Sequence, residues 1–201
     1  MRKSVHGSEE QADLFDRAAS LPSGFSYQAG LIEPQCERAL LAQLTRLPFH
    51  EFEFHGFQAK RRVVWFGWRY DFNGGGLRRT HEPLPPFLIS VRDRAAAYAQ
   101  IKPWDLQQVL VTEYRPGAAI GWHKDRSDFG VVVGLSLLSP CRFRLRRKNK
   151  VKWERVNLTL PPRSIYVLRG ASRSEWEHSI PAVSALRYSI TFRTVLDAGR
   201  N

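Results

Sequence analysis

Residues 131–138 of this chain read Val-Val-Val-Gly-Leu-Ser-Leu-Leu, and after Ser139-Pro140 the sequence continues over 141–145 as Cys-Arg-Phe-Arg-Leu. The first run is apolar, rich in β-branched residues and of the length of a buried strand. The second alternates apolar with basic residues, a period of two that is typical of a half-buried strand. Serine and proline between them indicate a break, so the sequence predicts two successive strands.

Similar short segments recur along the chain and predict a mainly β protein of the sandwich or barrel type. Two other segments, Pro34–Leu47 and Pro86–Ala99, instead have apolar residues at helical spacing. We therefore expect N-terminal helices packed on a double-sheet β domain. The further expected strands are Arg62–Phe66, Gln108–Tyr114, Val151–Leu160, Ser164–Leu168 and Arg187–Val195.

Composition limits the class of protein. The chain has 201 residues, 43% of them hydrophobic, which suits one folded domain. Residues 1–20 are polar and of mixed charge, so we expect a flexible tail before a single domain over 21–201. No apolar run reaches the roughly 18 residues of a membrane span, and no apolar segment follows Met1-Arg2-Lys3 as in a secretory signal. We expect a cytoplasmic monomer without membrane contact, in which Cys36 and Cys141 are plain thiols.

Charge points to a polyanionic partner. Lys and Arg number 31 against 19 Asp and Glu, which gives a net charge of +12. Such an excess favours nucleic acid, because neutralising phosphates releases counterions. Seven of the cations lie within 142–152, and a second basic group within 60–79 is interleaved with aromatic residues. The alternative is that both groups are solvated hairpins.

The motif Gly121-Trp122-His123-Lys124-Asp125 carries residues that can hold a metal ion. On extended backbone residues two apart point to the same side, so His123 and Asp125 can converge on one ion. A third ligand must come from elsewhere, and His178 is the best candidate. Two histidines and one carboxylate leave three open positions on an octahedral ion, the arrangement of non-haem Fe(II) oxygenases.

The segment 187–193 reads Arg-Tyr-Ser-Ile-Thr-Phe-Arg and places two guanidiniums and two hydroxyls on one face. That face consists of Arg187, Ser189, Thr191 and Arg193. Burying arginines without anionic partners is costly, so an inward orientation predicts a bound dianion with carboxylates, which guanidinium recognises well. The alternative is an exposed face, with a core formed by Tyr188, Ile190 and Phe192.

In this order the elements resemble those of the AlkB-type Fe(II)/2-oxoglutarate dioxygenases that dealkylate nucleic acids. The resemblance spans roughly residues 60–195. It rests on Glu113-Tyr114-Arg115-Pro116-Gly117, His123-Lys124-Asp125, Phe129-Gly130, Leu135-Ser136-Leu137, His178 and the segment 187–193. It implies a double-stranded β-helix, or jelly-roll, core over about 105–196, with a nucleotide-recognition lid over about 55–82.

The resemblance also implies cofactors and a reaction. Fe(II) would be held by His123, Asp125 and His178, and 2-oxoglutarate would bind the iron with its far carboxylate on Arg187. Tyr114 and Arg193 would help to bind this cosubstrate, alongside the hydroxyls of Ser189 and Thr191. With O2, the expected activity is oxidative removal of alkyl groups from DNA or RNA bases, releasing succinate, CO2 and an aldehyde.

Residues expected to contact the substrate lie mainly in the lid. Aromatic rings among cations suit a base extruded from the stack. The resemblance implies that Phe72 stacks on this base, opposite His123. The other expected substrate contacts are Tyr70, Trp68, Arg62, Ser127 and Asp128.

The chain departs from the family pattern at three positions. Thr112 and Ser189 stand where the family often has Asn, but both can still form hydrogen bonds. Ser127 stands where the family often has an acidic residue near the damaged base, which leaves the base preference open.

Two other classes of function fit parts of the pattern. A protein or small-molecule hydroxylase could use the same iron centre, but it would not need the basic, aromatic lid. A non-catalytic nucleic-acid-binding module would explain the charge but not the candidate metal ligands.

Overall fold

The computed structural model describes residues 21–54, 57–71, 76–80 and 82–196. The tail expected over 1–20 lies outside these ranges, and so does Phe72.

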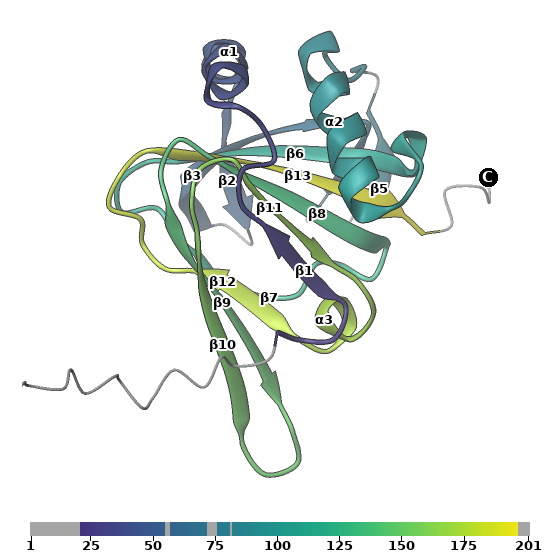
Figure 1. Ribbon diagram of the computed structural model, residues 1–201, viewed down its shortest axis with the longest axis vertical. Helices are drawn as coiled ribbons and strands as arrows, with labels where there is room; N and C mark the ends of the chain where they lie inside the picture. Colours follow the sequence, from purple (N-terminus) through teal and green to yellow (C-terminus); the bar gives the residue numbers. More distant parts are fainter. Residues whose placement is uncertain (1–20, 55–56, 72–75, 81, 197–201) are drawn as a thin grey trace, which may run out of the picture.

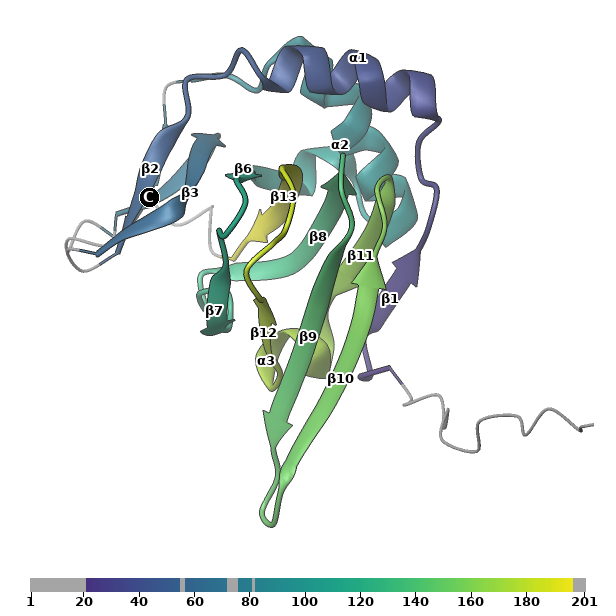
Figure 2. The same ribbon diagram turned by 90° about the vertical axis from the view of Figure 1, so that its left-hand side faces the viewer.

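Two antiparallel sheets face each other (Figures 1 and 2). In spatial order, the seven-stranded sheet consists of β1 (Phe25–Gln28), β11 (Ser164–Leu168), β8 (Phe129–Leu137), β13 (Arg187–Val195), β6 (Leu106–Tyr114), β3 (Phe57–Phe66) and β2 (His50–Phe54). The four-stranded sheet consists of β10 (Trp153–Leu160), β9 (Cys141–Lys148), β12 (Glu177–Ile180) and β7 (Ile120–His123). A separate ribbon pairs β4 (Trp68–Asp71) with β5 (Gly76–Arg79). From β6 to β13 the chain passes back and forth between the two large sheets, except that β9 and β10 are neighbours in the four-stranded sheet. This order agrees with the predicted jelly-roll core.

Helices α1 (Pro34–Leu44) and α2 (Pro86–Ala99) cover the outer face of the seven-stranded sheet (Figure 1). The bounds of α2 agree with the prediction. Helix α1 was predicted to reach Leu47, but it ends at Leu44 because Pro48 disfavours helical backbone at the residue before it. Two short helices follow, η1 (Pro103–Asp105) and α3 (Gly170–Ser174). None of the helices in the described ranges is long and apolar enough to cross a bilayer.

The predicted strands exist. Ser164–Leu168 and Arg187–Val195 have the predicted bounds, and the other strands have shifted ends. The strand predicted over 62–66 extends back to Phe57. The strand predicted from Val151 starts at Trp153, because Asn149 makes a turn in which its side chain accepts hydrogen bonds from the amides of Val151 and Lys152. The short strands β1, β2, β7 and β12 were not predicted, because four or five residues carry little periodic signal.

Apolar side chains form two cores. One lies between the helices and the seven-stranded sheet and includes Leu44, Leu88 and Phe192. The other lies between the two sheets and includes Phe143 and Leu145. Burial of each such side chain contributes about 1.5–3 kcal/mol. Strand β13 is therefore buried on both faces, and its second face turns toward the interior between the sheets.

Candidate active site

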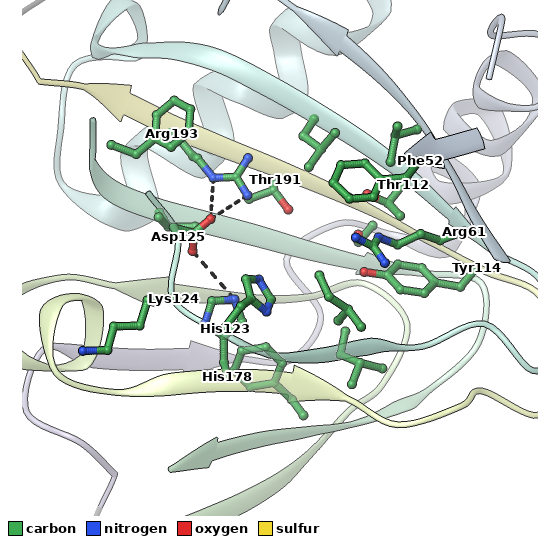
Figure 3. Close-up of a pocket in the computed structure, with 18 of the residues that line it drawn as sticks. Phe52, Arg61, Thr112, Tyr114, His123, Lys124, Asp125, His178, Thr191 and Arg193 are labelled. Carbon is green, nitrogen blue, oxygen red and sulfur yellow. Dashed lines mark hydrogen bonds and ion pairs between the residues drawn. The ribbon is translucent and has the colours of Figure 1, made fainter. Parts of the chain in front are cut away.

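A cavity of about 860 Å³ lies between the two sheets (Figure 3), a volume typical of small-molecule sites. Strands β3, β6, β8 and β13 line it from one sheet, and β7, β9 and β12 from the other. The period of two decides which residues reach it. All four residues of the predicted polar face of β13 line the cavity, so the solvent-exposed alternative is wrong: Arg187, Ser189, Thr191 and Arg193.

The three residues predicted as metal ligands come together at one end of this cavity. His123 ends β7, Asp125 follows two residues later, and His178 lies on β12, directly opposite His123 in the strand pairing. The two imidazole centroids are 4.2 Å apart, and His178 Nε2 is 3.7 Å from Asp125 Oδ2. Two imidazoles and one carboxylate therefore converge (Figure 3), although His178 lies 53 positions after Asp125 in the sequence (178 − 125).

The free atoms of this group suit a divalent metal. Asp125 Oδ2 is buried and has no hydrogen-bond partner among the described residues. His123 Nδ1 lies 2.9 Å from the Gly121 carbonyl oxygen, so a proton on Nδ1 leaves Nε2 free to coordinate. Metal-ligating histidines commonly donate their other ring N–H to a carbonyl in this way. The donor set fits Fe(II) in a two-histidine, one-carboxylate site.

Burial and charge set the protonation of these groups. Burial raises the pKa of Asp125, but Arg193 and the two imidazoles outweigh burial, so this pKa lies below its ordinary value. Burial is also the main cause of the lowered pKa of His178, and His123 lowers it further. The group thus holds an ionised carboxylate and a neutral imidazole at neutral pH, the forms that bind metal ions.

Arg193 is bound within the protein. Its Nε and Nη2 donate to Asp125 Oδ1 at 2.8 and 2.7 Å. Its Nη1 donates to Gln108 Oε1 at 2.7 Å. Arg193 therefore fixes one oxygen of Asp125 and leaves the other to face His178. Its expected contact with the cosubstrate stays a prediction.

Arg187 lies at the opposite end of the same strand face and is only 1% exposed. Its Nη2 donates to Ser136 Oγ at 3.1 Å, and its guanidinium lies 4.6 Å from the centroid of the Tyr114 ring. Its Nε and Nη1 are buried and find no acceptor in the described part of the chain. Because buried donors without acceptors are costly, this end of the cavity suits an anionic ligand.

The structure separates the expected substrate contacts. Tyr70 lines the cavity, with the guanidinium of Arg126 3.7 Å from its ring centroid. Trp68 does not line the cavity. Arg62 points away from it and donates to both oxygens of Glu113, at 2.8 and 2.9 Å. Ser127 is exposed. Asp128 is not among the lining residues, but it pairs at 3.2 Å with Arg126, which lines the cavity.

Several lining residues were not predicted. Arg61 reaches the cavity instead of Arg62, with its guanidinium 4.2 Å from the Phe52 ring centroid. Tyr166 also lines it, and Gly134 is the reason, because a Cβ there would lie 2.2 Å from the Tyr166 ring. The glycine within the apolar run 131–138 was the available signal for this close approach. Trp65 also lines the cavity.

Comparisons with known proteins agree with this geometry. Residues 30–193 match the family model of the 2OG-Fe(II) oxygenase superfamily. The uncharacterized protein L905 of Acanthamoeba polyphaga mimivirus is 30% identical over 196 residues, covering 90% of this chain and 88% of that protein. The "Alkylated DNA repair protein ALKBH8 homolog" of Arabidopsis thaliana is 30% identical over 147 residues, which are 61% of this chain and 42% of that protein. The solved structure of OsALKBH1 matches with a TM-score of 0.65 at 15% identity, covering 85% of this chain and 98% of that one.

The chain belongs to the 2OG-Fe(II) oxygenase superfamily. The similarity to the ALKBH8 homolog and to the fold of OsALKBH1 supports the AlkB-type resemblance that the sequence indicated. Together with the order of the strands, the likeness to OsALKBH1 confirms the predicted jelly-roll core. The superfamily uses Fe(II), 2-oxoglutarate and O2, so the predicted cofactors are confirmed.

Proposed function

We propose that this oxygenase removes alkyl groups from the bases of DNA or RNA. In this proposal His123, Asp125 and His178 bind Fe(II), and Arg187 binds the far carboxylate of 2-oxoglutarate beside Tyr114. The buried, unpartnered atoms at both places support these roles. Iron with 2-oxoglutarate and O2 supplies the oxidant that hydroxylates the carbon attached to a base nitrogen, after which the alkyl group leaves as an aldehyde.

Residues of the chain position this chemistry. Arg193 holds Asp125 ionised and oriented through one carboxylate oxygen. Arg173 donates to the backbone carbonyls of Arg126, Phe129 and Gly130, and so fixes the loop that follows Asp125. The apolar side chains around the cavity exclude water from the oxidant.

The observation that carries the nucleic-acid assignment is the pairing of rings with cations along the cavity. Arg61 lies over Phe52, and Arg126 lies over Tyr70. Arg69 lies 4.7 Å from the centroid of Trp65, which also lines the cavity. Rings accept a base by stacking while guanidiniums meet phosphates or base edges, a combination that suits an extruded nucleotide.

Turnover with matched substrates tests the proposal. Purified protein with Fe(II) and 2-oxoglutarate is offered N-methylated and unmethylated strands of one sequence, in DNA and RNA, and a peptide library. We expect formaldehyde with methylated strands only, together with an equal rise in succinate above the level released without any strand. Stimulation by peptides alone contradicts the nucleic-acid assignment and favours a protein hydroxylase. Tight strand binding with no succinate under any condition contradicts the enzymatic role.

A further inference from the structure

The basic run at 142–152 divides into two sets with different surroundings. Alternation along β9 buries Cys141, Phe143 and Leu145 against the inner core and turns the intervening cations to the outer face of the four-stranded sheet. These outward residues are Arg142, Arg144, Arg146 and Lys148. Arg147 departs from the pattern and pairs with Glu154 and Glu175 at 2.7 and 2.6 Å. The run is therefore more than a solvated hairpin, because part of it is neutralised and part is displayed.

Two tryptophans lie among the displayed cations. Arg144 and Arg146 lie 4.8 and 4.4 Å from the ring centroid of Trp122, and Arg146 also lies 4.5 Å from that of Trp153. In the pairing of β9 with β10, Trp153 lies opposite Lys148. Arg155 lies opposite Arg146 and adds a further cation to the same face. We call this surface the Trp-Arg face: Trp122, Arg142, Arg144, Arg146, Lys148, Trp153 and Arg155.

Part of the Trp-Arg face has no internal partner. Arg146 pairs with Glu177 at 2.5 Å, and Arg144 donates to Ser179 at 3.0 Å. By contrast, Arg142, Lys148 and Arg155 are exposed and form no ion pair within the described ranges. Trp153 is 39% exposed, which is unusual for so large an apolar ring. Three open cations beside an open ring form a surface that is complementary to a charged, stacking partner.

The face begins at the cavity. Trp122 lines the cavity and lies on β7, the strand at the edge of the four-stranded sheet, while β10 forms the opposite edge. Figure 2 shows β9 and β10 continuing as a long hairpin beyond the rest of the molecule. A nucleic-acid strand that has one nucleotide in the cavity can therefore continue over Trp122 and onto the β9–β10 hairpin.

We propose that the Trp-Arg face binds the single-stranded flank of the nucleotide whose base enters the cavity, with Arg142, Lys148 and Arg155 on phosphates and Trp153 stacked on an unpaired base. This rests on the proposed function, because it takes a nucleic acid as the substrate. Stacking on an exposed ring requires a base that is free of its complement, so the occupant is single-stranded. Duplex would offer phosphates alone.

The test compares two triple variants with the same change in charge. In one variant, the face variant, Arg142, Lys148 and Arg155 are each replaced by Ala. Its control removes Arg38, Arg46 and Arg94, which are exposed on or just after α1 and on α2, at the opposite end of the molecule. Affinity is measured by fluorescence anisotropy with labelled 12-mers, single-stranded and duplex, at 50 and 200 mM salt.

We expect the face variant to bind single strands on the order of 10-fold more weakly than the control variant, with a shallower dependence on salt. Trp153→Ala should lower the affinity for single-stranded oligonucleotides about 5-fold or more, and leave the affinity for duplex and the salt dependence unchanged. Its control is Trp104→Ala, which removes a ring that is 67% exposed near the end of α2. Equal losses in face and control variants overturn the proposal, as does an equal loss for duplex and single strand in Trp153→Ala. Binding of acidic peptides or anionic vesicles, but not of strands, through the face residues overturns it in favour of that partner.

Two readouts separate this proposal from the proposed function. Face variants should keep wild-type decarboxylation of 2-oxoglutarate without strand, since none of the changed residues lies in the cavity. A wild-type protein that binds strands through the face but releases no formaldehyde supports the face and contradicts dealkylation. If the triple variant and Trp153→Ala both dealkylate 12-mers normally at a subsaturating concentration of oligonucleotide, the result supports dealkylation and overturns the proposed role of the Trp-Arg face.

Discussion

The two ends of β13 carry the same side chain in opposite states. Arg187 and Arg193 lie on one face of one strand, and they are 1% and 9% exposed. Arg193 forms two bonds to Asp125 and one to Gln108. Arg187 donates only to Ser136 and keeps two buried nitrogens without partners in the described part of the chain.

This difference separates an arginine that holds a neighbouring carboxylate in place, Arg193, from one whose free donors suit an anionic ligand, Arg187. A buried guanidinium with its acceptors present stabilises the fold and fixes its partner, here the carboxylate of the candidate metal site. A buried guanidinium without them costs stability that a bound anion can offset. Strand β13 therefore carries one arginine that holds a carboxylate of the protein and one that we propose binds an anionic ligand, and Ser189 and Thr191 lie between them.

The largest effect is expected from removing the shared carboxylate. Asp125→Ala takes away a proposed metal ligand and the partner of Arg193, so we predict no succinate release above background. Release is measured with Fe(II), 2-oxoglutarate and methylated strand. Asp93→Ala is the control, because Asp93 is an exposed carboxylate on α2. Turnover surviving in Asp125→Ala would remove this residue from the metal site.

Replacing each arginine by Met should give opposite results. Arg193→Met leaves Asp125 buried without its charged partner, and we predict a loss of about 3–5 kcal/mol in the free energy of unfolding. Arg187→Met removes donors that lack acceptors, so we predict no loss, or a gain of about 1 kcal/mol. Urea denaturation of the protein without 2-oxoglutarate measures both. Equal destabilisation by the two changes would mean that Arg187 is satisfied in solution.

The sequence predicted this site well where local geometry suffices. His123 and Asp125 converge because residues two apart on extended backbone share a side, and the alternation of 187–193 correctly grouped its polar face. The same reasoning could not tell that Arg61, and not the predicted Arg62, reaches the cavity. Both stand within Lys60-Arg61-Arg62, and the pairing of Arg61 with Tyr114 on β6 decides which of them faces the cavity.

The third prediction concerns recognition alone. Arg187→Lys keeps the charge but loses the planar pair of donors, so we predict a rise of about 10- to 100-fold in the 2-oxoglutarate concentration for half-maximal turnover. In thermal unfolding, 2-oxoglutarate with Mn(II) should raise the midpoint of wild type and raise that of the variant much less. Arg163→Lys, outside the cavity, is the control. An unchanged requirement would place the anion elsewhere.

The smallest effect is expected behind the Arg187 end, on the other face of the sheet. Glu113 is buried and accepts four hydrogen bonds, two from Arg62, one from Arg115 and one from the Tyr188 hydroxyl. Burial raises the pKa of Glu113, but these bonds outweigh burial and the pKa lies below its ordinary value. Ionised Glu113 therefore stabilises the fold above the pKa of the unfolded chain, and this contribution is lost as pH falls through the lower pKa of the folded state.

Glu113→Gln tests this support separately from recognition. A glutamine has one acceptor oxygen and turns an NH2 toward donors of Arg62 or Tyr188, so we predict a loss of about 1–3 kcal/mol at pH 7. The difference from wild type should shrink as pH falls below about 4, because the unfolded wild-type chain then takes up a proton on Glu113 that the folded state takes up only at lower pH. Urea denaturation at pH 7 and pH 3.5 measures this, with exposed Glu82→Gln as control. The 2-oxoglutarate requirement should stay as in wild type, since Glu113 lies outside the cavity. A difference that is constant with pH would show that Glu113 acts by shape rather than by charge.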